Sequence, residues 1–224
     1  MKYLLSTTFF FFFAILAINS QDLFADLDKW NESITVENSL IKFNIETTLL
    51  RADGENHSYE TQFQIFDKQY IIESQGISVF ADDKNYFLIN HHLKTIDQLD
   101  IVETEDPVNA FQKYIEFLSN VDADKNIAFS KIDHIKKYSV NGLEELGIEH
   151  YEISFSELTN ELLRIRIELK KVAEYGDVKY INLAFSDVNK VANPNFENPF
   201  VKVTGNQLIP QSDYHSYTIK TGTL

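Results

Sequence analysis

The sequence contains no cysteine, and it has only 7 glycines and 4 prolines in 224 residues. Without cysteine, the chain can form no disulfide, no thiolate metal site and no acyl-cysteine anchor. So few glycines and prolines argue against a disordered or low-complexity chain. Stability must therefore come from a packed hydrophobic core, and about 200 residues are enough to bury one.

Positive charge is also scarce. The chain has 20 Lys and Arg against 34 Asp and Glu, which gives a formal net charge of −14. A surface of this sign repels nucleic acids and anionic membrane surfaces. Solubility explains the acidic surface better than a cation-binding role does. We therefore expect no nucleic acid among the partners.

Long hydrophobic runs are absent except at the start of the chain. After Lys2, an apolar stretch extends from Tyr3 to Ile18 and is followed by a small residue, Ser20. This is the pattern of a secretory signal peptide. The stretch is shorter than the roughly 20 apolar residues that span a bilayer, so an uncleaved anchor is the weaker alternative. We expect residues 1–20 to be a signal peptide that directs the protein to the periplasm or the extracellular space.

Period-two alternation of apolar and polar residues dominates the rest of the chain and predicts strands with two unlike faces. A helix is expected near the start, with Leu23, Leu27 and Trp30 on its apolar side and Asp26 on its polar side. The tail after Asn193 is expected to be irregular, with one short strand. The predicted strands cover residues 41–49, 59–65, 70–74, 77–81, 86–90, 93–101, 138–141, 151–155, 163–169 and 181–185.

A second helix is expected in the middle of the chain. Asp106 is a suitable N-cap and Pro107 is favourable at the first helical position. The next residues place an apolar stripe on one side of the helix, made of Val108, Phe111, Tyr114, Ile115 and Leu118. The pattern predicts an amphipathic helix of about three turns.

These elements predict a mainly β fold. We expect one large antiparallel sheet of nine to eleven strands, and a sheet this wide must curl. An unclosed barrel with the helices over its concave side fits the pattern, and a packed sandwich is the alternative. Because no linker or composition shift interrupts the chain, residues 21–224 are expected to form a single domain.

Motifs of catalysis are missing. The sequence has no Gly-x-Ser-x-Gly, no glycine-rich phosphate loop and no dinucleotide fingerprint. The adjacent pair His91 and His92 falls at a predicted turn, where solvated loop residues are the better interpretation. We therefore expect no enzyme, no catalytic residue, no metal and no cofactor.

One motif resembles a calcium loop in its spacing. Oxygen-bearing residues stand at positions one, three, five, nine and twelve, namely Asp122, Asp124, Asn126, Ser130 and Asp133. A second helix from Lys131 to Tyr138 would complete the motif. However, Ile127 occupies the position that needs glycine for a sharp turn. A polar loop is therefore favoured over a calcium site.

Abundant apolar surface remains to be explained. The strand around Leu88 carries bulky side chains on both faces, because Phe87 and Ile89 point opposite to Tyr86 and Leu88. A thick ordinary core and a ligand cavity explain this equally well. In the second case, the candidate ligand-binding residues are Phe63, Ile65, Tyr86, Leu88, Phe111, Ile115, Leu118, Ile165 and Ile167.

The stretch YIIESQGISVFADDKNYFLIN, from Tyr70 to Asn90, resembles a region of the periplasmic outer-membrane lipoprotein carriers, the LolA-like family. Asp82 matches the turn aspartate of that family, and Tyr86 stands near its tryptophan. The helix expected over residues 107–118 corresponds in order to a helix of the family's lid.

This resemblance implies an unclosed barrel with a helical lid that acts as a chaperone for acyl chains. It also implies transport of a lipoprotein to an outer-membrane acceptor. The alternative is a non-catalytic interaction module of the cell envelope, with a filled core and an acidic protein-binding surface.

Overall fold

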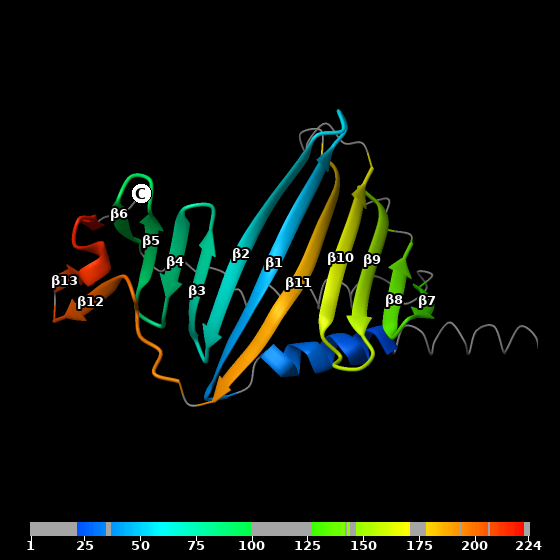
Figure 1. The fold of residues 1–224 in the computed structure, drawn as a ribbon, viewed down its shortest axis with the longest axis horizontal. Coiled ribbons are helices and arrows are strands. Elements are labelled where there is room, and N and C mark those ends of the chain that lie inside the picture. The colour runs from blue at the N-terminus through cyan, green and yellow to red at the C-terminus, as the bar shows by residue number, and fades with distance from the viewer. Residues whose placement is uncertain are drawn as a thin grey trace, which may run out of the picture. The chain divides into compact units, whose positions relative to one another are not determined.

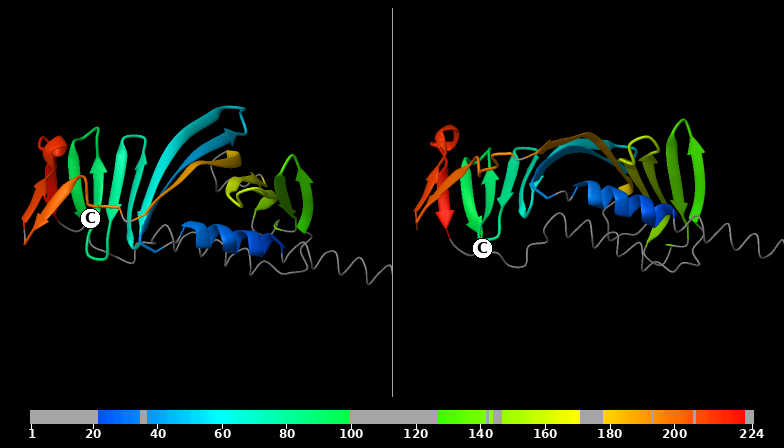
Figure 2. Two further views of the ribbon diagram at one scale, coloured as in Figure 1. Left: turned by 60° about the horizontal axis from the view of Figure 1, so that its bottom comes forward. Right: turned by 90° about the horizontal axis from the view of Figure 1, so that it is seen from below.

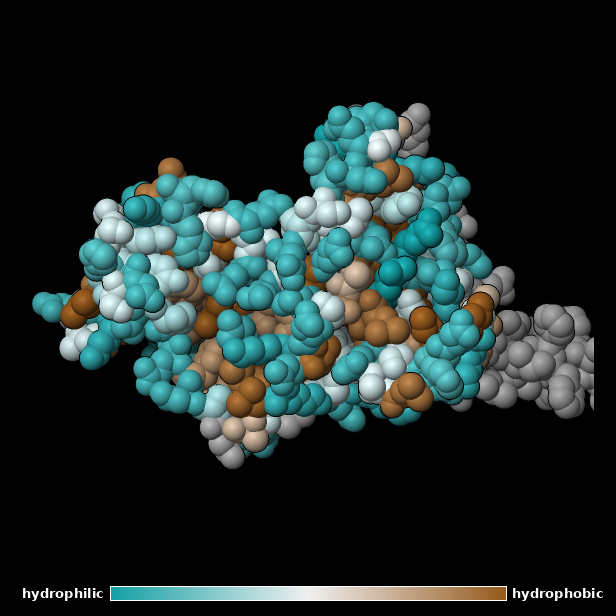
Figure 3. Space-filling view, in the orientation of Figure 1, coloured by the Kyte–Doolittle hydropathy of each residue, from teal (hydrophilic) through white to brown (hydrophobic). Residues whose placement is uncertain are grey.

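The computed structural model describes residues 22–34, 37–99, 127–141, 143, 147–170, 178–192, 194–205 and 207–221. The predicted signal peptide and the predicted helix over residues 107–118 lie outside these ranges. The described part is mainly β, with one α-helix over residues 22–34 (Figure 1). Its surface in the view of Figure 3 is mostly hydrophilic, with smaller hydrophobic patches between.

Every predicted strand overlaps a strand of the structure, but the structure also contains strands that were not predicted. The strands are β1 Ser39–Arg51, β2 Asn56–Phe66, β3 Gln69–Ser74, β4 Ile77–Ala81, β5 Tyr86–Asn90, β6 Thr95–Leu99, β7 Ile127–Ile132, β8 Ile135–Val140, β9 Ile148–Ser156, β10 Leu162–Leu169, β11 Val178–Ala192, β12 Val201–Thr204, β13 Gln207–Pro210 and β14 Thr218–Thr221. The strands β4 and β5 begin and end where the sequence predicted.

Twelve strands form one sheet in the order β14-β6-β5-β4-β3-β2-β1-β11-β10-β9-β8-β7. Neighbours from β2 to β6 and from β7 to β11 pair antiparallel, whereas β14 pairs parallel with β6. The two outermost strands in this order do not pair with each other, so the sheet is unclosed. The prediction of a mainly β, unclosed sheet is confirmed.

One prediction about local structure is wrong. The tail after Asn193 forms the hairpin β12-β13, a 3-10 turn at Ser212–Tyr214 and the edge strand β14, instead of mostly irregular chain. The segment from Lys131 to Tyr138, where the disfavoured calcium motif would have needed a helix, forms parts of β7 and β8. In both places short strands gain their hydrogen bonds from partners, which local sequence does not reveal.

Contacts divide the chain into two compact units. The first comprises residues 1–33, 47–58 and 106–185, and the second comprises residues 34–46, 59–105 and 186–224.

In the first unit, the helix packs against one face of the sheet. Leu23, Leu27 and Trp30 are buried, and the Trp30 ring meets the Phe185 ring edge-on, with 6.3 Å between centroids. The strands of this unit arch over the helix (Figure 2). The predicted apolar side of the helix is confirmed.

Asp26 contradicts the predicted polar side of this helix, because it is almost fully buried. Its carboxylate accepts a hydrogen bond from the Tyr138 hydroxyl at 2.7 Å and one from Lys136 Nζ at 2.8 Å. Burial and this carboxylate raise the pKa of Tyr138 well above its ordinary value, so the hydroxyl stays a donor. Two partners on β8 thus replace the water that an exposed aspartate would have.

In the second unit, the C-terminal segment covers one face of the meander β3 to β6. Its residues Phe200 and Val201 are buried in one cluster with side chains of that face, which are Ile71, Phe80, Phe87, Ile89 and Ile96. At the edge, the Thr218 amide donates to the Lys94 carbonyl at 2.9 Å as β14 begins. The protein therefore covers this face of the meander with its own chain.

Candidate functional site

The strand register of the second unit brings uncharged residues together on the other face of β2 to β5. Directly paired residues in neighbouring antiparallel strands share a face. The register therefore places twelve side chains on one side, namely Thr61, Phe63, Ile65, Tyr70, Ile72, Ser74, Ile77, Val79, Ala81, Tyr86, Leu88 and Asn90. None of the twelve is charged, so we call this set the neutral face.

The neutral face contains two apolar rows that cross four strands. The first row is Phe63, Ile72, Val79 and Leu88, and the second is Ile65, Tyr70, Ala81 and Tyr86. Since neighbouring strands lie about 4.8 Å apart, each row extends for about 14 Å. The rows therefore offer a continuous apolar strip.

Burial differs between the two rows, because Ile65, Tyr70 and Ala81 of the second row are buried. All four side chains of the first row, from Phe63 to Leu88, are half-buried. The Phe63 ring stacks on Phe43 of β1, with centroids 5.0 Å apart and planes within 5°. Tyr86 is also half-buried, and desolvation raises the pKa of its hydroxyl. These side chains retain accessible apolar area.

Four of the predicted ligand-binding residues meet on the neutral face: Phe63, Ile65, Tyr86 and Leu88. Two others, Ile165 and Ile167, lie on β10 in the first unit and pair with Ile153 and Tyr151 of β9. The remaining three, Phe111, Ile115 and Leu118, lie outside the described residues.

Sequence reasoning missed four members of the two rows: Tyr70, Ile72, Val79 and Ala81. Their strands were predicted, but their alternation is too short to show which side chains share a face. The signal was available in the turn lengths, because the two-residue turn between β3 and β4 fixes the register of that hairpin.

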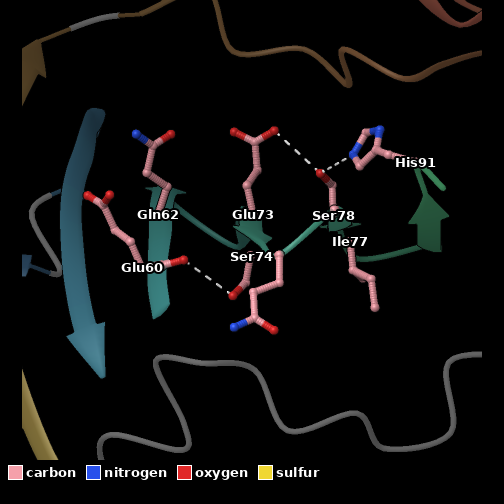
Figure 4. Close-up of a pocket in the computed structure, with 9 residues that line it drawn as sticks. Glu60, Gln62, Glu73, Ser74, Ile77, Ser78 and His91 are labelled. Atoms are coloured by element: carbon pink, nitrogen blue, oxygen red, sulfur yellow. Dashed lines mark hydrogen bonds between the residues drawn. The ribbon is translucent and has the colours of Figure 1, made fainter. Parts of the chain in front are cut away.

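A second, polar site lies at the turn between β3 and β4. It is a pocket of about 290 Å³ lined by Glu60, Gln62, Glu73, Ser74, Gln75, Gly76, Ile77, Ser78 and His91. In Figure 4, the side chains of Glu73, Ser78 and His91 stand on one side of the strands, and those of Ser74 and Ile77 stand on the other.

A chain of hydrogen bonds crosses this pocket. His91 Nε2 lies 2.7 Å from Ser78 Oγ, and His91 Nδ1 lies 3.0 Å from the Tyr217 hydroxyl. Ser78 Oγ also donates to Glu73 Oε1 at 3.4 Å. His91 therefore links the meander to the C-terminal segment.

The pKa of the Tyr214 hydroxyl is raised. Desolvation is the main cause, and the negative charge of Glu73 is a smaller one.

The prediction that both neighbouring histidines are solvated loop residues is wrong for His91 and confirmed for the exposed His92. The His91 ring packs among Phe200, Tyr214 and Tyr217, at centroid distances of 5.9 to 6.4 Å. The reason is the C-terminal segment, whose aromatic residues come from more than a hundred positions further along the chain.

Replacing Gly76 by alanine is expected to lower the free energy of unfolding by about 2 kcal/mol. Gly76 has φ +79°, where a Cβ is unfavourable, and that Cβ would also collide with the His92 imidazole. Gly54→Ala is the matched control, because Gly54 has φ +89° with open space around it. Urea unfolding of both variants tests the difference, and equal losses would show that His92 moves aside without cost.

Metal chemistry finds no support in the described ranges. No group of three or more His, Cys, Asp or Glu side chains there could hold a metal ion. Of the residues with calcium-loop spacing, Asp122, Asp124 and Asn126 lie outside those ranges, and Ser130 belongs to β7. No helix in the described part is long and apolar enough to cross a membrane.

No protein-family model matches the chain, and no curated protein matches it. Among solved structures, it resembles an uncharacterized conserved protein from Thermus thermophilus, with 10% identity, a TM-score of 0.45 and coverage of 88% of this chain and 98% of that one. A LolA superfamily protein from Nitrosomonas europaea shares 11% identity, with a TM-score of 0.33 and coverage of 73% and 91%.

A putative outer membrane lipoprotein-sorting protein domain from Vibrio parahaemolyticus shares 10% identity, with a TM-score of 0.33 and coverage of 76% and 92%.

Proposed function

We propose that this protein is an exported carrier or binding protein for an acylated, hydrophobic ligand that lies against the neutral face. The observation that supports it is the composition of that face. Twelve neighbouring positions carry no charge in a chain of which 24% is charged. The opposite face of the same meander packs against the C-terminal segment, and the row from Phe63 to Leu88 on the neutral face stays half-buried.

The energetics favour an acyl chain as the ligand. Each methylene removed from water contributes about 0.8 kcal/mol. About ten covered methylenes therefore contribute roughly 8 kcal/mol before the entropic cost of binding. The apolar rows extend for about 14 Å, which suits a chain of that size.

The cellular role follows from the first residues and from the order of the elements. Residues 1–20 have the pattern of a secretory signal peptide, which supports work in the periplasm. The resemblance of residues 70–90 to LolA-like carriers supports a lipoprotein as cargo and an outer-membrane acceptor as its destination. In this proposal, Phe111, Ile115 and Leu118 form the inner side of a lid.

Titration with a fluorescent fatty acid tests the proposal. We expect saturable binding at one site per chain. A natural fatty acid should displace the probe. If the protein enhances no fluorescence and binds no fatty acid, the carrier function is wrong, and the acidic surface makes an envelope interaction module the better explanation.

A further inference from the structure

The Tyr86 hydroxyl is a polar group at the corner of the neutral face. Tyr86 begins β5, and its paired neighbours are Ala81 on β4 and Leu99 on β6. The next residue of β5 on the same face is Leu88. A phenol in these surroundings has apolar neighbours on three sides.

No side chain or backbone group within the described ranges forms a hydrogen bond with this hydroxyl. Two other tyrosine hydroxyls have such partners. The Tyr217 hydroxyl, in the C-terminal segment, contacts His91, and the Tyr138 hydroxyl donates to Asp26. Tyr86 is half-buried, and desolvation is the cause of its raised pKa. Its hydroxyl therefore stays protonated at neutral pH and is available as a donor.

The Tyr86 hydroxyl lies at one end of the apolar rows. From Tyr86, the first row leads across Leu88 and Val79 to Ile72 and Phe63. A ligand that lay along this strip with its polar head group at Tyr86 would cover the apolar side chains with its acyl chain. Its head group would meet the Tyr86 hydroxyl as a donor, and Asp97 of β6, which pairs with Leu88, is the charged residue that the register places on this side.

We propose that the Tyr86 hydroxyl is the polar anchor of the ligand and donates a hydrogen bond to the carbonyl or carboxylate oxygen of an acyl group. This inference rests on the carrier function proposed above and narrows it. The ligand class becomes fatty acids and fatty acyl esters, in preference to plain hydrocarbons. Tyr86 then determines specificity, because a hydrocarbon leaves the hydroxyl without a partner.

The variant Tyr86→Phe removes one oxygen atom and keeps the ring. Three probes separate the contributions of the hydrocarbon, the carbonyl group and the carboxylate charge to binding. Diphenylhexatriene is a fluorescent hydrocarbon, palmitic acid carries a carboxylate, and methyl palmitate keeps the carbonyl without charge. Diphenylhexatriene is titrated directly, and the other two are measured as competitors. The control is Tyr180→Phe, because Tyr180 lies on β11 in the first unit.

We expect Tyr86→Phe to bind diphenylhexatriene as the unmodified protein does and to bind both palmitoyl ligands about three- to tenfold more weakly, the effect of one hydrogen bond. Weakening for palmitic acid alone would assign the anchor to free carboxylates. Unchanged affinity for both palmitoyl ligands would overturn the anchor but leave the carrier function standing. If the unmodified protein binds none of the three probes, both the carrier function and the role of Tyr86 as an anchor are wrong.

Discussion

Replacing Asp26 by alanine is expected to lower the free energy of unfolding by about 3–5 kcal/mol. The change leaves the Tyr138 hydroxyl and the Lys136 ammonium without the carboxylate that accepts from both at 2.7 and 2.8 Å. An unpaired ammonium that is largely buried is the costly part of this loss. Trp30 is the only tryptophan of the chain and packs against Phe185, so its fluorescence during urea unfolding reports on the helix.

Two further variants make this prediction specific. Asp28 is exposed on the same helix, and Asp28→Ala should change stability by less than about 0.5 kcal/mol. Asp26→Asn keeps an oxygen that can accept from Tyr138 but loses the charge opposite Lys136, so it should fall between the two alanine variants. If Asp26→Ala and Asp28→Ala unfold at the same urea concentration, the buried carboxylate does not hold the helix to β8.

Replacing Leu88 by aspartate is expected to weaken binding of a fluorescent fatty acid by at least about tenfold. Leu88 is half-buried in the first apolar row. A carboxylate there must keep its water, because burying an unpaired charge against an acyl chain costs several kcal/mol. The far-UV circular dichroism should remain that of a folded β protein, since accessible area lets the new side chain reach solvent.

The matched control is Ile209→Asp. Ile209 is 46% exposed on β13 and belongs to the same unit, but it does not lie on the neutral face. The same charge at this position should leave fatty-acid affinity unchanged. Equal affinities for the Leu88 and Ile209 variants would place the ligand elsewhere on the protein.

Alternation of apolar and polar residues was sufficient to predict most strands and the apolar side of the N-terminal helix. It failed where partners distant in sequence decide the outcome. Asp26 looks like a residue of the polar side until Lys136 and Tyr138 meet it, although its spacing from Leu23 and Trp30 already places it within the apolar stripe. His91 is half-buried because Tyr217 reaches it from the far end of the chain.

At the candidate site too, the sequence predicts single residues but not the contacts that depend on distant partners. The sequence predicted Phe63, Ile65, Tyr86 and Leu88 as ligand-binding residues, because bulky residues on both sides of a strand are conspicuous. It could not show that these four share a face that carries no charge, because that depends on the register of three successive hairpins. Nor could it place Ile165 in a different compact unit.

Native mass spectrometry of the protein purified from the cell envelope, with lipid extraction of the same sample, tests the central claim most directly. If the protein is a carrier, we expect a bound acyl species close to one per chain. The Leu88→Asp variant, purified in the same way, should carry none. A clean mass of the protein alone, together with failure to take up added fatty acid, would contradict the account and show that the neutral face does not hold a ligand.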